Sequence, residues 1–174
     1  RVGIFEKYYM GSFLEQKEKY KIALSMTEDM TMAAVKIDSK IAVDGKMNEE
    51  SWKNAKPADM VSIKEGEKPK VKTLVRVLYD DKNLYIFFEC EEPEISRLRT
   101  VATAEKLSLL WRDDEVEIFL DPEGERKNFF QILVNAAGVI QDIRRTGGLA
   151  DSNWASGAKS ATGRYDKGWT VEMA

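Results

Sequence analysis

The spacing of the apolar residues most constrains what this chain can fold into. From Thr31 onward, runs of about five to eight residues rich in Val, Ile, Phe and Tyr alternate apolar with polar positions. Turn residues separate these runs at intervals of roughly 8 to 12 residues. This pattern is typical of short antiparallel strands, so we expect an all-β fold, an antiparallel β-sandwich.

Two pairs of these runs flank short polar turns and are predicted to form hairpins. The runs 73–79 and 84–90 flank the turn 80–83, and the runs 115–120 and 129–135 flank the turn 121–124. Pro122 and Gly124 suit a type I turn. Further strands are expected at 139–143, after the turn 135–138, and at 169–173.

Two segments favour helix instead. A short helix is expected at 49–55, with Asn48 as N-cap and acidic residues at the positive end of the helix dipole. Residues 1–30 carry apolar side chains at mostly helical spacing: Phe5, Tyr9, Phe13, Tyr20 and Leu24. We expect 1–30 to be a short helical segment: the tail of an upstream domain, a docking helix, or a short helix packed on the main domain. The sandwich would then occupy 31–174 and be truncated at its C-terminus.

Composition and charge exclude several classes of protein. The 30 acidic residues against 27 basic ones give no broad positive field, so nucleic acid is not an expected partner. The absence of histidine excludes Ser-His-Asp and Cys-His catalysis and histidine-ligated haem. No apolar run approaches the ~20 residues that span a membrane. Cys90 is the single cysteine, so no internal disulfide forms.

The strands predicted at 115–120 and 129–135 each alternate between two faces. The side chains expected in the core are Val116, Ile118, Leu120, Phe130, Ile132 and Val134. The opposite face then carries Glu115, Glu117, Phe119, Gln131, Leu133 and Asn135. A carboxylate beside two amides offers the acceptors and donors that sugar hydroxyls require, and the ring of Trp111 can stack on a pyranose.

The same residues also fit structural interpretations. Antiparallel sheets commonly have one solvated polar face, and alternation alone favours that interpretation here. Trp111 suits a core anchor, although its polar neighbours indicate a partly exposed loop, and Trp52 is assigned to the core. Asp114 and Glu117 form a glycosidase carboxylate pair only if they lie close together. Their opposite strand parity disfavours this, unless Asp114 lies in the loop before the strand.

Five segments resemble, in order, the motifs of family 9 carbohydrate-binding modules. Residues 41–52 resemble the opening IDGxxDExxW pattern and 75–85 the first hairpin. Residues 111–122 resemble the WxDDxVEIFLDP strand, 130–135 the YQxxVN strand and 168–172 the GWxvE strand. The resemblance extends from about Val35 to the end of the chain.

This resemblance implies a DOMON-like sandwich of the immunoglobulin or jelly-roll kind and non-catalytic binding of oligo- or polysaccharides. It implies an accessory module of a secreted polysaccharide-processing protein, hence an extracytoplasmic location and contacts with other domains of the same parent chain. Structural calcium is also implied, for which the acidic loops 80–83, 91–94 and 113–114 offer oxygens without matching an EF-hand. Neither haem nor a nucleotide is expected.

The resemblance implies that Trp111 is a ring-stacking residue, that Glu117 accepts sugar hydroxyls and that Asn135 is a polar partner on the next strand. Arg112 and Gln131 are expected to add hydrogen bonds. The second stacking tryptophan of the family would follow the end of this chain, and Trp154 is a candidate substitute.

One departure from the family pattern leaves the function open. Leu133 stands where sugar-binding members carry an arginine donor. Two alternatives therefore remain: a structural or protein-interaction sandwich that has lost the sugar site, or a fragment of a glycoside hydrolase. Catalytic residues of an enzymatic parent would be expected outside these 174 residues.

Overall fold

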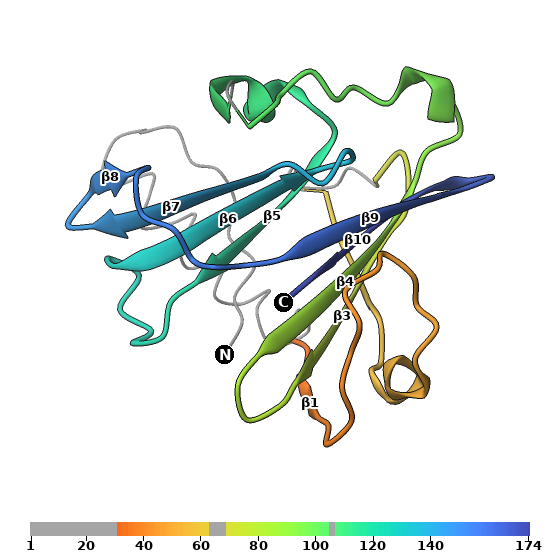
Figure 1. Ribbon diagram of the computed structural model, residues 1–174, viewed down its shortest axis with the longest axis horizontal. Helices are drawn as coiled ribbons and strands as arrows, with labels where there is room; N and C mark the ends of the chain where they lie inside the picture. Colours follow the sequence, from red (N-terminus) through yellow and green to blue (C-terminus); the bar gives the residue numbers. More distant parts are fainter. Residues whose placement is uncertain (1–30, 63–68, 105–106) are drawn as a thin grey trace.

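Two β-sheets face each other in the computed structural model, which describes residues 31–62, 69–104 and 107–174 (Figure 1). The larger sheet has the strand order β1-β3-β4-β10-β9, with β2 paired to β3. Its strands are β1 (Val35–Lys36), β2 (Ala58–Asp59), β3 (Thr73–Tyr79), β4 (Leu84–Glu91), β9 (Ser160–Tyr165) and β10 (Gly168–Met173). The predicted helix within 1–30 lies outside the described residues.

The smaller sheet has the order β5-β6-β7-β8. Its strands are β5 (Glu115–Leu120), β6 (Phe129–Asn135), β7 (Ile140–Thr146) and β8 (Leu149–Asp151). Within the described part of the chain, three short 3-10 helices lie outside the sheets: η1 (Glu50–Asn54), η2 (Ile95–Arg97) and η3 (Leu107–Arg112). The predicted β-sandwich is confirmed.

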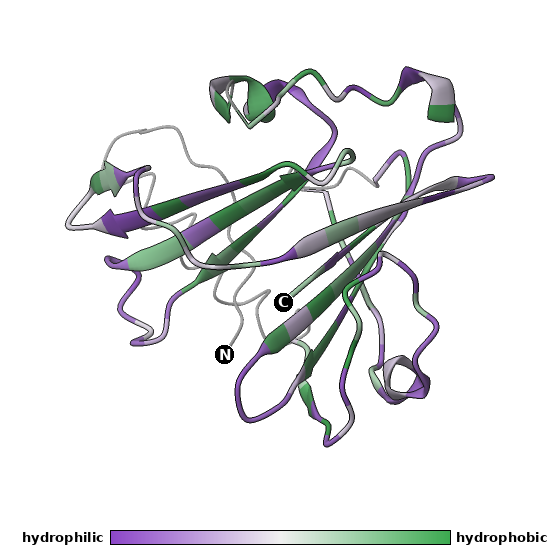
Figure 2. Cartoon of the chain, viewed as in Figure 1, coloured by the Kyte–Doolittle hydropathy of each residue, from purple (hydrophilic) through white to green (hydrophobic). Residues whose placement is uncertain are grey.

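Both predicted hairpins are confirmed. β3 pairs antiparallel with β4, and β5 with β6. In the first turn, the backbone N–H of Asp80 donates to the carbonyl of Asn83 at 3.0 Å. In the second, Gly124 has a φ of +69° and its N–H donates to the Asp121 carboxylate at 2.8 Å. One pair departs from the antiparallel pattern, because β1 runs parallel to β3. Figure 2 shows apolar residues concentrated on the strands and polar residues in the connections between them.

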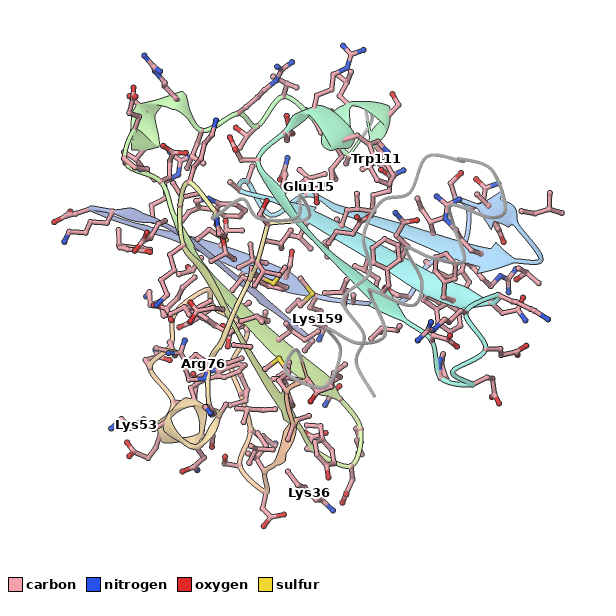
Figure 3. All side chains as sticks on the ribbon, turned by 180° about the vertical axis from the view of Figure 1, so that it is seen from behind. Lys36, Lys53, Arg76, Trp111, Glu115 and Lys159 are labelled. Carbon is pink, nitrogen blue, oxygen red and sulfur yellow. The ribbon has the colours of Figure 1, made fainter. Side chains whose placement is uncertain are left out.

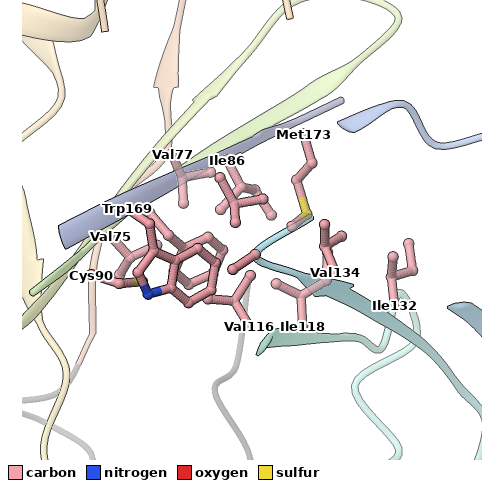
Figure 4. Packing of buried hydrophobic residues seen from close by; sticks show 13 residues of the cluster. Val75, Val77, Ile86, Cys90, Val116, Ile118, Ile132, Val134, Trp169 and Met173 are labelled. Carbon is pink, nitrogen blue, oxygen red and sulfur yellow. The ribbon is translucent and has the colours of Figure 1, made fainter. Parts of the chain in front are cut away.

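The main core lies between the two sheets and follows the predicted alternation. Figure 4 shows Val75 and Trp169 from the larger sheet packed against Val116 and Ile118 from the smaller one. Cys90, on β4, belongs to this cluster, and its burial raises the pKa of its thiol to about 12. Burying each large apolar side chain contributes about 1.5–3 kcal/mol to folding, which makes this interface the main source of stability.

A second core covers the outer face of the larger sheet. There Trp52, which is 1% exposed, packs against Phe87 with ring centroids 5.5 Å apart. The prediction of Trp52 as a core residue is confirmed, but the helix prediction is wrong in two respects. η1 is a 3-10 helix, and it is preceded by Glu49 rather than capped by Asn48. The Asn48 amide instead donates to the carboxylate of Asp44 at 3.3 Å.

A third cluster covers the outer face of the smaller sheet. Leu110 on η3 and Ala102 pack against Leu133 and Ile143, which are 0% and 5% exposed. The interpretation of this face as solvated is therefore wrong for its central residues. Gln131 and Asn135 are 3% and 0% exposed, because residues on η3 and before it lie over β6 and β7.

Candidate functional site

Three polar side chains form a hydrogen-bonded row on the outer face of the smaller sheet, one from each of β5, β6 and β7. The Gln131 amide Nε2 donates to Oε1 of Glu117, and Arg145 Nε donates to Oε1 of Gln131 at 2.8 Å. An arginine can only donate and an ionised carboxylate can only accept, so these neighbours fix the orientation of the Gln131 amide. We call Glu117, Gln131 and Arg145 the polar row.

Trp111 lies on the same side of the smaller sheet as the polar row. It is on η3, is half-buried, and packs against the cluster formed by Leu110 and Leu133. Figure 3 shows Trp111 beside the start of β5, where Glu115 begins the strand. Arg112 follows at the end of η3 and is exposed. The structure thus places Glu117 and Gln131 on one face, as the strand parity predicted, and Trp111 on η3 lies on the same side.

Asp113 and Asp114 hold the covering segment in place. Asp113 accepts the backbone N–H groups of Val101 and Ala102 at 2.7 and 2.9 Å, and Asp114 accepts that of Arg99 at 2.7 Å. Desolvation raises the pKa of the Asp113 carboxyl, but the donated N–H groups outweigh it and the pKa is lowered. The two acidic residues therefore connect the start of β5 to the chain that precedes η3.

Both polar atoms of the Asn135 side-chain amide are hydrogen-bonded within the protein. Its Nδ2 donates to Asp113 at 2.8 Å, and its Oδ1 accepts the N–H groups of Ala137 and Val139 at 3.0 and 2.9 Å. These bonds close the turn between β6 and β7. Asn135 lies on the predicted face, and in this arrangement it supports the turn and Asp113.

Glu172, the acidic residue of the last motif, lies far from the polar row on the outer face of the larger sheet. It is 0% exposed and accepts N–H groups from Asp44 and Gly45 at 2.9 Å each and from the Trp52 indole at 3.3 Å. Burial raises the pKa of this carboxyl, which the backbone donors only partly offset. The first and last motifs therefore meet in one buried network.

Comparison with known families decides the identity of the domain. Residues 43–174 match the family model described as carbohydrate family 9 binding domain-like. The chain belongs to this family. The predictions of the family and of a carbohydrate-binding module are confirmed.

Solved structures share the fold of this family 9 domain. A family 9 carbohydrate-binding module from Caldicellulosiruptor kristjanssonii in complex with cellotriose has 20% sequence identity over 82% of this chain, with a TM-score of 0.60. A structure of a family 9 module from the same organism in complex with glucose has 18% sequence identity over 81% of this chain and a TM-score of 0.59. A protein from Bacteroides uniformis has 17% identity over 80% and a TM-score of 0.59.

This chain spans 66%, 67% and 69% of the lengths of those three structures. A search of curated proteins gave no match. Within the described residues, no helix has the length and apolar character needed to cross a membrane.

The family 9 domain places Trp154 away from the polar row. Its ring stacks on Phe130 with centroids 4.7 Å apart and an interplanar angle of 27°. Phe130 neighbours Gln131 on β6, so the two side chains point to opposite faces of the sheet. Phe130 thus stacks on Trp154 instead of joining the main core cluster, and Trp154 and Trp111 lie on opposite sides of the smaller sheet.

Arg145 is not among the predicted site residues, because the predicted strand ends at Ile143 whereas β7 continues to Thr146. Arg145 pairs with Phe129, and Ile143 with Gln131, so all four side chains share one face. A strand extended by three residues would have placed Arg145 beside Gln131 by parity alone.

The acidic loops of this family 9 domain use their carboxylates internally. Asp80 accepts the N–H groups of Lys82 and Asn83 at 2.7 Å each, Glu91 accepts that of Lys72 at 3.0 Å, and Glu92 accepts that of Glu94 at 2.7 Å. Within 31–62, 69–104 and 107–174, no three acidic or cysteine side chains are grouped to hold a metal ion. Calcium binding therefore stays a prediction.

Proposed function

We propose that this family 9 domain binds gluco-oligosaccharides on the outer face of its smaller sheet. Trp111 stacks on one sugar ring, and Glu117 accepts hydrogen bonds from its hydroxyls. The observation that carries this proposal is the placement of Glu117 and Trp111 on the same face, with Glu117 oriented by the amide of Gln131. The related structures that hold cellotriose and glucose support this class of sugar.

The chemistry of each group suits a sugar. A tryptophan ring packs on the apolar C–H face of a pyranose, and an ionised carboxylate makes stronger hydrogen bonds than a neutral acceptor. Arg112, exposed at the end of η3, is a further donor within the same region. Gln131 and Asn135 contribute by orienting Glu117 and by holding Asp113.

The affinity should be modest. One stacking contact and a few hydrogen bonds made in competition with water leave little free energy after the cost of association. We expect dissociation constants of roughly 10 μM to 1 mM. Such binding fits an accessory module that holds a secreted polysaccharide-processing protein on its substrate, with the other domains of that protein beside it.

Isothermal titration with cellotriose, glucose and a panel of plant, fungal and bacterial glycans tests the proposal. Trp111→Ala should weaken binding of cellotriose by roughly tenfold or more. Tyr165→Ala is the matched control, because Tyr165 is an exposed aromatic on β9 of the other sheet. If the folded wild-type domain binds no glycan, the proposal is wrong and the interaction-domain alternative is favoured.

Calcium is tested separately by thermal unfolding. Bound calcium stabilises the folded state by mass action, so adding millimolar calcium to the chelator-treated domain should raise Tm. An unchanged Tm would reject calcium binding by this chain.

A further inference from the structure

We propose that Arg145 determines sugar specificity in this site, by donating from its guanidinium to a sugar oxygen adjacent to the hydroxyl that Glu117 binds. This inference rests on the proposed function. It concerns the chemistry of the ligand: a neutral sugar with two neighbouring hydroxyls.

The backbone places Arg145 on the outer face of the smaller sheet, beside Gln131. It pairs with Phe129 across β6 and β7, two positions from the pair between Gln131 and Ile143. Its side chain is half-buried, and its Nε donates to Gln131 at 2.8 Å. The stem of Arg145 is therefore held over the sheet face that carries Glu117.

The hydrogen bond through Nε leaves the other end of the guanidinium for a ligand. Arginine has five N–H donors in a planar fork. Among the described residues, the Arg145 side chain makes a single hydrogen bond, the one to Gln131. The four N–H groups on the two terminal nitrogens make no hydrogen bond to a described residue.

The charges along the polar row match a pair of sugar hydroxyls. Glu117 at one end accepts hydrogen bonds, Arg145 at the other end donates them, and one amide group separates them. A sugar hydroxyl both donates and accepts, so one hydroxyl can donate to Glu117 while its neighbour accepts from Arg145. The adjacent carboxylate disfavours an acidic sugar, since like charges repel.

Among the described residues of β5, β6 and β7 that point to this face, Arg145 is the one cationic donor, and Gln141, which pairs with Leu133, carries a neutral amide. Leu133 sits between β5 and β7 and is 0% exposed. Arg144, the residue before Arg145, points to the opposite face and pairs with Asp151 at 2.8 Å. Arg144 therefore provides a matched control of the same residue type on the same strand.

The test compares cellotriose binding by the full chain and three variants in isothermal titration. Arg145→Met keeps the aliphatic stem and should weaken binding by roughly tenfold or more, because a charge-assisted hydrogen bond is lost. Arg145→Lys keeps the charge without the fork and should fall between wild type and Arg145→Met. Arg144→Met should stay within about twofold of wild type. Equal Tm values confirm that affinities are compared between folded proteins.

Monodeoxy glucosides distinguish a direct contact from a general structural effect. If Arg145 binds one hydroxyl, the glucoside that lacks this hydroxyl should bind to Arg145→Met no more weakly than either change alone would make it. All other deoxy positions should combine additively with Arg145→Met.

Failure of this inference can be distinguished from failure of the proposed function. If the wild type binds and Arg145→Met binds equally well, or if every deoxy position is additive with it, the role of Arg145 is refuted while the proposed function stands. If the wild type binds no sugar, the proposed function fails and this inference fails with it.

Discussion

The indole N–H of Trp52 donates a hydrogen bond to the carboxylate of Glu172, 3.3 Å away and 120 residues later in the chain. The other carboxylate oxygen accepts the backbone N–H groups of Asp44 and Gly45. These residues carry the first and last motifs of the family resemblance. The motifs therefore describe a structural connection between an early loop and the final strand, separate from the polar row.

Removing the Glu172 carboxylate should be strongly destabilising. Glu172→Ala leaves three N–H groups without their acceptor inside the protein and should lower the free energy of unfolding by about 3–5 kcal/mol. Glu172→Gln keeps one acceptor oxygen and should cost less. Urea unfolding measures both. Glu50→Ala is the control, because its carboxylate is 83% exposed and pairs with Lys53 on the surface. Equal losses for Glu172→Ala and Glu50→Ala would contradict the network.

Gly45 should not tolerate a side chain. It has a φ of +80°, and an added Cβ would lie 2.7 Å from the carbonyl carbon of Thr162. Gly45→Ala should therefore cost more than the roughly 1 kcal/mol of the left-handed backbone alone. Gly124→Ala isolates that backbone cost, because Gly124 has a φ of +69° and nothing within 4 Å of its added Cβ. Chemical denaturation that shows the same loss for both variants would count against the close contact.

Asp113→Ala should release the segment that carries the N–H groups of Val101 and Ala102. These amides should lose protection in hydrogen exchange, because Asp113 is their acceptor. Sugar affinity should fall as well, since η3 and Trp111 follow this segment. Asp59→Ala serves as a surface control, with a carboxylate 62% exposed and paired with Lys72. Unchanged exchange at Val101 and Ala102 would show that Asp113 does not hold them.

Asp80 should contribute to unfolding in acid. N–H groups of Lys82 and Asn83 and the hydroxyl of Tyr85 lower the pKa of its carboxyl from 3.8 to about 2. Since the folded pKa is below the unfolded one, the unfolded state binds more protons between these values. The stability that Asp80 provides is complete above the unfolded pKa and is lost as pH falls from about 4 to about 2. Asp80→Asn should reduce the fall of Tm between about pH 4 and about pH 2. Parallel profiles of Tm against pH for the wild type and Asp80→Asn would contradict this role of Asp80.

The hairpins were predictable because their signals are local. Alternation and turn residues such as Pro122 and Gly124 lie within a few positions of the strands they connect. The burial of Gln131 and Asn135 was not predictable in this way. It depends on a covering segment with no strand periodicity, which Asp113 and Asp114 hold from a distance along the chain.

The candidate site was predicted in part for the same reason. Strand parity placed Glu117 and Gln131 together, because both lie within well-marked strands. Arg145 was missed because β7 becomes polar before it ends, and polar residues conceal a strand boundary. The opposite orientation of Trp154 follows from its stacking on Phe130, a contact between a loop and a strand that composition does not indicate.

The position of Cys90 gives the domain an internal reporter of its own unfolding. A thiol reacts as the thiolate, so a buried cysteine with a pKa near 12 is inert to alkylating reagents while the sandwich is closed. Alkylation of this single cysteine then proceeds at the rate at which the sheets separate. A second cysteine introduced at Leu149, which is 79% exposed, would be modified selectively in the native domain and would allow it to be attached to a surface or a dye.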